Sequence, residues 1–245
     1  KLECNFKTFN NFGEDRDFSY ERVLFSDPSY ILYTSGTTGA PKAIVHSVGG
    51  VILQHLKEHK IHCDIKVGDR AMWYTNIAWM MYHWIVSTMA CESTLVLYDG
   101  APIVNRKTFI NYSLLWDVAE KTKLTHMGIS PKYLSSLQDN NFFPNKNYDF
   151  NNLKWLMSAG SPVAPQQFDW VYNSIKSDMG FASISGGSEL MGCFFLGSPM
   201  HSVRRGELTV KGLGMGVDIF NDKNDSIVGK PGDLVCTEPF PSMPV

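Results

Sequence analysis

The chain has 245 residues, enough for one large domain or two small ones, and 44% of them are hydrophobic. Charged residues make up 19% and the formal net charge is −2, which argues against a disordered chain. Because there is no basic block, the composition also argues against a dedicated surface for nucleic acid or for an anionic membrane.

Apolar runs and helix-spaced apolar positions alternate along most of the chain. We expect strands at 29–36, 71–75, 94–100, 124–129, 153–160 and 181–185. Helices are expected at 48–61, 81–90, 107–121, from Pro131 onward, and at 165–175, where Pro165 stands in the first turn. This order predicts an α/β fold in which parallel strands are joined by crossover helices.

The pattern changes near residue 200. Short strand-like runs are separated there by turn residues at 221–225 and 229–233, and no helix is indicated. We therefore expect residues 1–200 to form the parallel-sheet core and residues 201–245 to begin a small antiparallel, barrel-like β unit.

The cysteines and the lengths of the apolar runs indicate the compartment in which the protein is expected to work. The five cysteines are widely spaced and form no C-x-x-C pair, so we expect neither a disulfide framework nor a thiolate zinc site. The longest apolar runs are shorter than the 18 or so residues of a membrane span. A cytosolic protein is the expectation, and the oligomeric state stays open.

The segment 34–47 carries the strongest chemical signal. Glycines allow backbone N–H groups to approach an anion closely, hydroxyls add donors, and a lysine adds positive charge. These are the properties that a polyphosphate needs from a loop. The donors are Thr34, Ser35, Gly36, Thr37, Thr38, Gly39 and Lys42.

The Walker A pattern is the nearest competing interpretation of this loop. Counted from Gly36, the pattern places its lysine at Lys42. However, Pro41 stands where the second glycine belongs, and Ala43 replaces the hydroxyl that would bind magnesium. The Walker interpretation therefore fails at two essential positions.

The segment 33–42, YTSGTTGAPK, resembles the phosphate-binding signature of the adenylate-forming superfamily, which contains acyl-CoA synthetases, luciferases and peptide-synthetase adenylation domains. Three further segments follow in the order of that superfamily: 76–102, 158–165 and 183–192. The stretches 46–64, 73–84 and 210–220 look more specifically like the ligases of this superfamily that act on acetoacetate. The resemblance covers roughly 30–245.

The resemblance implies a reaction in two halves. A carboxylate attacks the α-phosphate of ATP and releases pyrophosphate, and the thiol of coenzyme A then displaces AMP. Lys42, Thr37 and Thr38 would hold the β- and γ-phosphates, while Ser188 would hydrogen-bond the α-phosphate. Glu189 would bind Mg²⁺, a hard cation that prefers oxygen ligands. The remaining nucleotide contacts would come from Gly160, Ser161, Pro162, Ser185 and Gly187.

The resemblance also implies an acyl pocket. Acetate-activating relatives carry Trp-Trp-Gln ahead of the metal-binding glutamate, whereas Ser185, Gly186 and Gly187 stand here. Loss of an indole at Gly186 would leave room for the second acetyl unit of acetoacetate. Trp79, with an ordinary core aromatic as the competing interpretation, would form one wall. Met80 and Ala159 complete the expected acyl contacts, and Ser130 is the expected contact to coenzyme A.

Two alternatives to an acetoacetate ligase stay open. The pocket could accept another short or branched acid, or the chain could be a non-catalytic nucleotide-binding relative. The superfamily continues beyond the motifs found here into a ribose-binding aspartate, a hinge and a mobile C-terminal domain with a catalytic lysine. We therefore expect this chain to be a central piece that is inactive alone.

Three histidines, His55, His59 and His62, recur at helical spacing. A zinc site on one helix face is one interpretation, and a polar helix face is the other and the preferred one. For His46, directly after the phosphate loop, the sequence does not separate a supporting role from plain packing.

Overall fold

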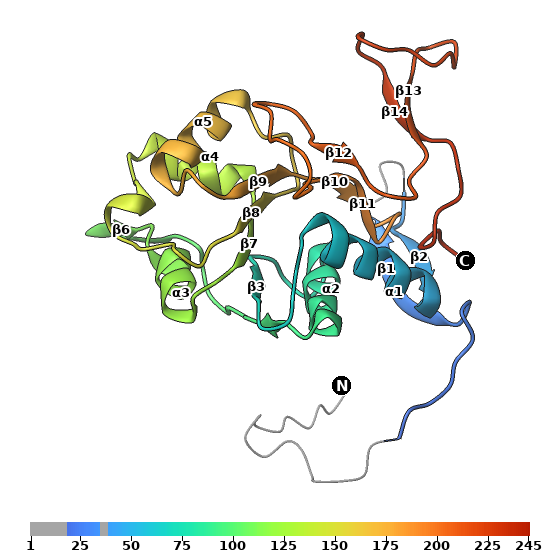
Figure 1. The fold of residues 1–245 in the computed structure, drawn as a ribbon, viewed down its shortest axis with the longest axis horizontal. Helices are drawn as coiled ribbons and strands as arrows, with labels where there is room; N and C mark the ends of the chain where they lie inside the picture. The colour runs from blue at the N-terminus through green and yellow to red at the C-terminus, as the bar shows by residue number, and fades with distance from the viewer. Residues whose placement is uncertain (1–18, 35–38) are drawn as a thin grey trace.

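The computed structural model describes residues 19–34 and 39–245, so the loop positions Ser35, Gly36, Thr37 and Thr38 lie outside the described residues. A five-stranded parallel sheet forms the centre of the molecule (Figure 1). From one edge to the other its strands are β4 (Thr94–Leu95), β3 (Arg70–Trp73), β7 (His126–Ile129), β8 (Trp155–Ser158) and β9 (Gly180–Ser183).

Helices cover both faces of this sheet. The helices are α1 (Val48–Lys57), α2 (Met80–Val86), α3 (Leu114–Thr122), α4 (Pro131–Asp139) and α5 (Pro165–Ser174). Side chains of α3, α4 and α5 form one core cluster against the sheet, and side chains of α2 form a second cluster on the other face. The predicted α/β fold with a parallel sheet is confirmed.

The buried strands show why the sequence pattern located the sheet. All four residues of β7 and of β8 are buried, as expected where helices pack on both faces. Along β8, Trp155 and Met157 join one core cluster and Leu156 joins the other, because successive side chains point to opposite faces. A continuous apolar run is therefore the signature of these strands.

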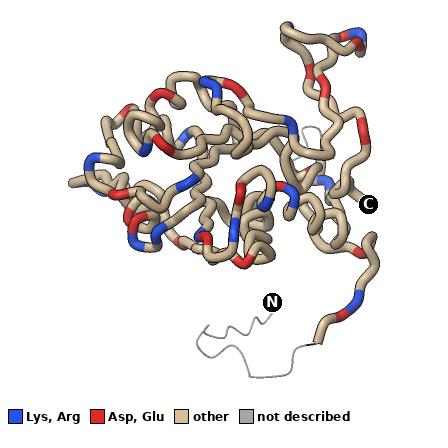
Figure 2. Tube along the Cα trace, viewed as in Figure 1, with Lys and Arg blue, Asp and Glu red and all other residues tan. Residues whose placement is uncertain are grey.

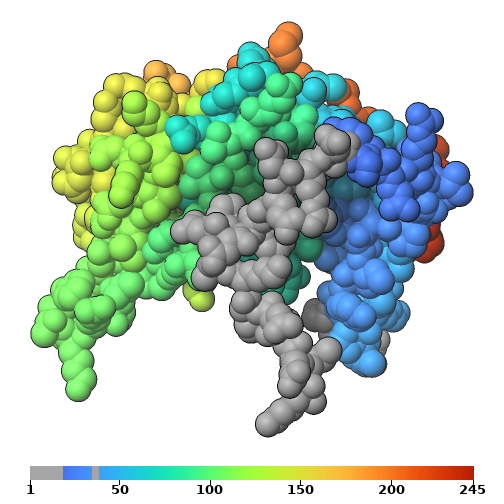
Figure 3. Space-filling model, turned by 90° about the horizontal axis from the view of Figure 1, so that it is seen from below, coloured from blue at the N-terminus to red at the C-terminus, as the bar shows by residue number. Residues whose placement is uncertain are grey.

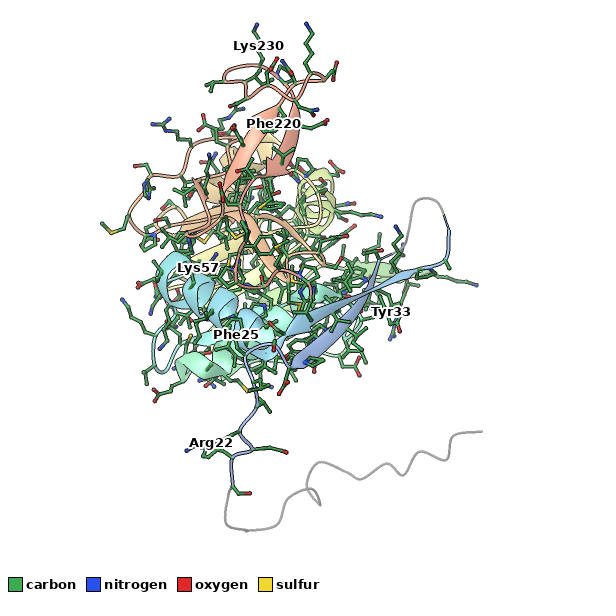
Figure 4. All side chains as sticks on the ribbon, turned by 90° about the vertical axis from the view of Figure 1, so that its right-hand side faces the viewer. Arg22, Phe25, Tyr33, Lys57, Phe220 and Lys230 are labelled. Carbon is green, nitrogen blue, oxygen red and sulfur yellow. The ribbon has the colours of Figure 1, made fainter. Side chains whose placement is uncertain are left out.

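The phosphate-loop segment departs from the predicted pattern of parallel strands. β1 (Pro28–Thr34) pairs antiparallel with β2 (Lys42–Ser47), and the two form a hairpin outside the parallel sheet. The connection between them is far too short for a crossover helix, whereas an antiparallel pair needs only a turn. Figure 4 shows the hairpin, with Tyr33 on it, extending from the body of the molecule.

Several predicted elements have different bounds in the structure, and three differ in kind or extent. The expected helix 107–121 begins at Leu114, and the residues before it form the hairpin of β5 (Val104–Arg106) and β6 (Phe109–Asn111). The strand expected over 94–100 is limited to Thr94–Leu95. The helix expected over 48–61 ends at Lys57 and continues as a π-helical turn, Glu58–His62. In Figure 3 the green region around β5 and β6 projects from the body.

After β9 the chain forms only short antiparallel strand pairs. A three-stranded sheet joins β10 (Ser185–Gly187), β11 (Gly192–Leu196) and β12 (Val210–Lys211), and β13 (Val217–Phe220) pairs with β14 (Asp233–Cys236). Figure 4 places Phe220 and Lys230 on the β13–β14 projection. Short helical turns at Ser87–Cys91 and Pro144–Lys146 complete the structure.

Charges of both signs are interspersed along the described chain (Figure 2). Among the residues that the structure describes, no helix is long and apolar enough to cross a membrane.

The histidines of the α1 region are buried, so the prediction of a polar helix face was wrong. His55 and His59 are at most 1% exposed and His62 is 3% exposed. Their ring nitrogens bond to other segments: His55 Nε2 lies 2.7 Å from Met191 O and His62 Nδ1 lies 3.0 Å from Gly197 O. Within residues 19–34 and 39–245, no group of three His, Cys, Asp or Glu could hold a metal.

Burial lowers the pKa of His55 to about 4, against an ordinary value of 6.5, although its bond to Met191 O acts in the opposite direction. Since the unfolded chain binds more protons between these two values, stability is complete above pH 6.5 and is lost as the pH falls toward 4. At pH 5 the loss corresponds to about 2 kcal/mol.

We predict that His55→Gln weakens this pH dependence. A glutamine amide can still donate to Met191 O but has no proton to take up. The free energy of unfolding should therefore fall less between pH 8 and pH 5 in the variant than in the parent, by about 2 kcal/mol. Denaturant titrations at both pH values provide the measurement. Equal pH dependence in both proteins would mean that His55 is not held neutral.

Candidate functional site

A pocket of about 460 Å³ opens where β8 and β9 end. Its wall includes Ala159 directly after β8 and Ser183 at the end of β9. The carboxyl ends of parallel strands are the usual ligand-binding edge of an α/β sheet, because the loops that follow diverge there. Position alone therefore makes this pocket the candidate site.

The pocket brings together residues from three of the sequence motifs. The start of α2, the turn after β8 and the β10 segment each contribute part of its wall. The predicted site residues that line it are Trp79, Met80, Ala159, Gly160, Ser161, Pro162, Ser185, Gly186 and Gly187. The expected acyl contacts and the expected adenine contacts thus share one cavity.

Trp79 lies at the mouth of this pocket. It is the residue immediately before α2, its backbone is extended there, and its side chain is 62% exposed. An ordinary core aromatic would be buried, so that competing interpretation was wrong. The indole is therefore available to contact a ligand.

The turn after β8 presents backbone rather than side chains. Gly160 adopts φ +101°, a conformation that residues with a side chain rarely adopt, and the space beside its Cα is open. Ser161 and Pro162 follow it along the pocket wall. A flat ring could approach this turn closely.

Gly186 faces crowding that the sequence did not reveal. A Cβ at this position would lie 2.2 Å from the carbonyl oxygen of Gly192 on the neighbouring strand β11. The missing side chain would therefore meet β11 instead of extending freely into the cavity. Glycine at 186 has a packing reason, besides any reason of substrate size.

Thr34 is the last residue of β1 and Lys42 is the first residue of β2, at the loop end of the phosphate hairpin. They are cross-strand partners in the register of β1 and β2, so the first and the last donor of the expected phosphate loop lie side by side. The Lys42 side chain is exposed, as is Gly39. Neither Thr34 nor Lys42 is among the described residues that line the pocket.

Ser188 and Glu189 lie in the turn between β10 and β11. The Ser188 hydroxyl donates to Glu189 Oε2 over 3.3 Å, and Glu189 is exposed. A lone carboxylate and a hydroxyl supply hard oxygen ligands that fit Mg²⁺, which retains several waters and takes further oxygens from a nucleotide. The turn could therefore hold the metal only together with its phosphate ligand.

Ser130 has a structural role that accounts for its position. Its hydroxyl accepts a hydrogen bond from Tyr133 N at 3.2 Å and so caps the start of α4. Ser130 is not among the described residues around the pocket. Its contact with coenzyme A stays a prediction.

The connection between β11 and β12 supplies pocket residues that the sequence did not suggest. Three of the lining residues come from this connection, and three more come from other elements. The former are Gly206, Glu207 and Leu208, and the latter are Met81, Val163 and Cys193. No local motif marks them, since they reach the pocket only through the path of a long connection. The sequence of residues 206–208, a glycine, a glutamate and a leucine, matches no binding motif.

Comparison with known proteins supports the motif assignment. The family model described as AMP-binding enzyme matches residues 10–243. The acetoacetyl-coenzyme A synthetase of Rhizobium meliloti (strain 1021) is 45% identical over 226 residues, which are 92% of this chain and 34% of that protein. The acetoacetyl-CoA synthetase of Gallus gallus is 40% identical over 225 residues, 92% of this chain and 33% of that protein.

A solved structure agrees with these relatives. The acetoacetyl-CoA synthetase from Streptomyces lividans superimposes with a TM-score of 0.86 at 37% identity, covering 94% of this chain and 35% of that one. The resemblance expected from the motifs is thereby confirmed. The chain spans about one third of the length of the curated relatives that it matches.

We predict different costs for alanine at two adjacent glycines of the pocket. Gly186→Ala places a Cβ against backbone, whereas Gly187→Ala places one 3.0 Å from the flexible end of Glu189. The first should lower the free energy of unfolding by about 1–3 kcal/mol more than the second. Chemical denaturation of both variants measures the difference. Equal stabilities would show that β10 and β11 are not held in close contact.

Proposed function

Because the chain belongs to the AMP-binding enzyme family, we propose that the protein containing it is an ATP-dependent acid–CoA ligase that activates acetoacetate. The main observation in support is that the turn after β8, the start of α2 and the β10 segment meet in one pocket. The names of the relatives at 40–45% identity support acetoacetate as the acid.

The proposed reaction begins with adenylate formation. A carboxylate oxygen of the acid attacks the α-phosphorus of ATP, a P–O bond forms, and the bond to pyrophosphate breaks. The protein forms no covalent bond in this step, so positioning and charge neutralisation carry the catalysis. Lys42 and the hydroxyls of the loop, Thr37 and Thr38 among them, would bind the departing phosphates.

The second half of the proposed reaction makes the thioester. The sulfur of coenzyme A attacks the acyl carbon of the adenylate, and AMP leaves with the electron pair of the broken C–O bond. The products are acetoacetyl-CoA, AMP and pyrophosphate. Ser130 remains the candidate contact for coenzyme A.

Within the pocket, we assign the two ends of the adenylate to different walls. Gly160, Ser161 and Pro162 would contact adenine, since this turn exposes backbone and carries no bulky group. Trp79, Met80 and Ala159 would contact the acyl group, because they supply the larger apolar surfaces. Mg²⁺ held by Glu189 and the phosphates would neutralise negative charge near the α-phosphate.

We also propose that residues 1–200 belong to the adenylation core and that residues 201–245 begin a separate β subdomain. The change from alternating strands and helices to short antiparallel pairs supports this division.

An acid panel tests the proposed function. The protein as its gene encodes it would be supplied with MgATP, coenzyme A and either acetoacetate, acetate, propionate or butyrate, and pyrophosphate would be measured. Acetoacetate should give the highest kcat/KM, with one thioester formed per AMP. A higher value for another acid would identify a different short-chain ligase. No acid-dependent pyrophosphate would indicate a non-catalytic nucleotide-binding protein.

We predict that Glu189→Gln lowers kcat for pyrophosphate release by about 10²-fold. The amide removes a negative charge that would hold the metal during adenylyl transfer. The fold should be retained because Glu189 is exposed. Glu92→Gln, at another exposed glutamate, provides the matched control and should leave kcat unchanged. Near-normal release by Glu189→Gln would contradict the metal-binding role.

We predict that Trp79→Ala changes the preferred acid length. Removal of the indole widens the mouth of the pocket, so kcat/KM for 3-oxohexanoate should rise by about tenfold relative to that for acetoacetate. Ile77→Ala is the control, because Ile77 is also exposed but does not line the pocket. An unchanged ratio in Trp79→Ala would place the acyl group elsewhere.

A further inference from the structure

His46 is a fully buried histidine at the end of the phosphate hairpin. It lies in β2, one residue before the strand ends at Ser47, and its exposed fraction is 0%. Its Nε2 atom is 2.7 Å from the carbonyl oxygen of Ser188, and its Nδ1 atom is 2.9 Å from the carbonyl oxygen of Ser242. Both ring nitrogens therefore contact backbone, on opposite sides of the ring.

Both partners of the ring are hydrogen-bond acceptors. A ring nitrogen that carries a proton donates to its carbonyl oxygen. The buried ring is therefore held between the carbonyl groups of two different segments.

His62 shows the opposite arrangement in an equally enclosed place. Its Nδ1 atom donates to Gly197 O, while its Nε2 atom accepts a hydrogen bond from Leu213 N at 3.0 Å. One donor and one acceptor match a neutral ring. The paired acceptors around His46 are thus a feature of that site and not of buried histidines in this protein generally.

The two bonds of His46 join three segments that are distant in the sequence. The ring belongs to the hairpin that carries Lys42, and its Nε2 bond reaches the turn that carries Glu189. The Nδ1 bond reaches the last described segment of the chain, where Val245 N also donates to Val45 O at 3.0 Å. Figure 1 shows the C-terminal end beside β2.

The third segment is itself attached to the turn. The Ser242 hydroxyl donates to Leu190 O, immediately after Glu189, and Ser242 is fully buried. The carbonyl group of Pro241 lies so close to α1 that a Cβ at Gly50 would meet its oxygen at 2.2 Å. The Ser188–Leu190 turn is therefore bounded by His46 on one side and by Ser242 on the other.

We propose that His46 is a positioning residue whose buried ring, held between Ser188 O and Ser242 O, fixes the Ser188–Glu189 turn against the phosphate hairpin. This role rests on the proposed function, since it places the metal-binding carboxylate relative to the lysine that binds phosphate. His46 itself is buried and does not contact the nucleotide. Its effect on catalysis is transmitted through the carbonyl of Ser188.

Two amide substitutions separate the two bonds. The amide nitrogen of glutamine reaches the place of Nε2, so His46→Gln keeps a donor toward Ser188 O. The amide nitrogen of asparagine reaches the place of Nδ1, so His46→Asn keeps a donor toward Ser242 O only. A merely structural role would respond to both variants alike.

Kinetics of pyrophosphate release provide the first measurement. His46→Asn should lower kcat/KM for MgATP by about tenfold while KM for acetoacetate stays unchanged, and His46→Gln should stay within about threefold of the parent. His126→Phe, a buried histidine at the start of β7, is the control and should lower thermal stability without changing these constants. Equal kinetic losses in the Asn and Gln variants would overturn the proposal.

Calorimetric titration with MgATP provides the second measurement, which does not depend on the reaction. His46→Asn should bind MgATP about tenfold more weakly than the parent, and His46→Gln should stay within about threefold of it. Equal binding by the parent and His46→Asn would overturn the proposal. If the parent protein released no pyrophosphate, the proposed function would fail, and this binding measurement would still decide the role of His46.

Discussion

The contact between the Glu58 carboxylate and β11 determines where the site lies. Glu58 is fully buried, and its Oε1 atom accepts hydrogen bonds from Cys193 N at 2.9 Å and from Gln54 Nε2 at 2.6 Å. Its Oε2 atom accepts from the Trp84 indole at 2.7 Å. A buried carboxylate is stable only with such a set of donors, so α1, α2 and β11 are held in one arrangement.

Close packing at two glycines connects the Glu58 carboxylate with the pocket wall. A Cβ at Gly192 would lie 2.8 Å from Glu58 Oε1, and a Cβ at Gly186 would lie 2.2 Å from Gly192 O. The two strands thus stack on the carboxylate without any side chain between them. The position of the pocket wall at Gly186, and of the turn that follows, is a consequence of this close packing.

Elements with a strong local signal were predictable from the sequence. The buried strands β7 and β8 and the helix α5 follow from apolar runs and from periodicity. The β1–β2 hairpin and the β5–β6 hairpin did not follow, because pairing depends on partners that periodicity does not identify. Three of the segments that form the pocket wall were located by motif, but Glu207 and its neighbours reach the pocket only through tertiary structure.

The histidines illustrate the same limit. Polar residues at helical spacing favour a solvated face, yet His55 and His59 are buried because carbonyl and hydroxyl groups of other segments bond their rings. Only the folded chain shows which partner each nitrogen meets. That partner decides which segments a ring joins, as for His62 between Gly197 and Leu213 and for His46 between Ser188 and Ser242.

The most direct test of the proposed site is a crystal structure of the protein, as its gene encodes it, with a non-hydrolysable sulfamoyl analogue of acetoacetyl-adenylate. The adenine ring should lie against the turn Gly160–Pro162, and the acyl group should contact Trp79 in the pocket at the ends of β8 and β9. An analogue bound with its acyl group outside this pocket, or with adenine away from that turn, would contradict the assignment.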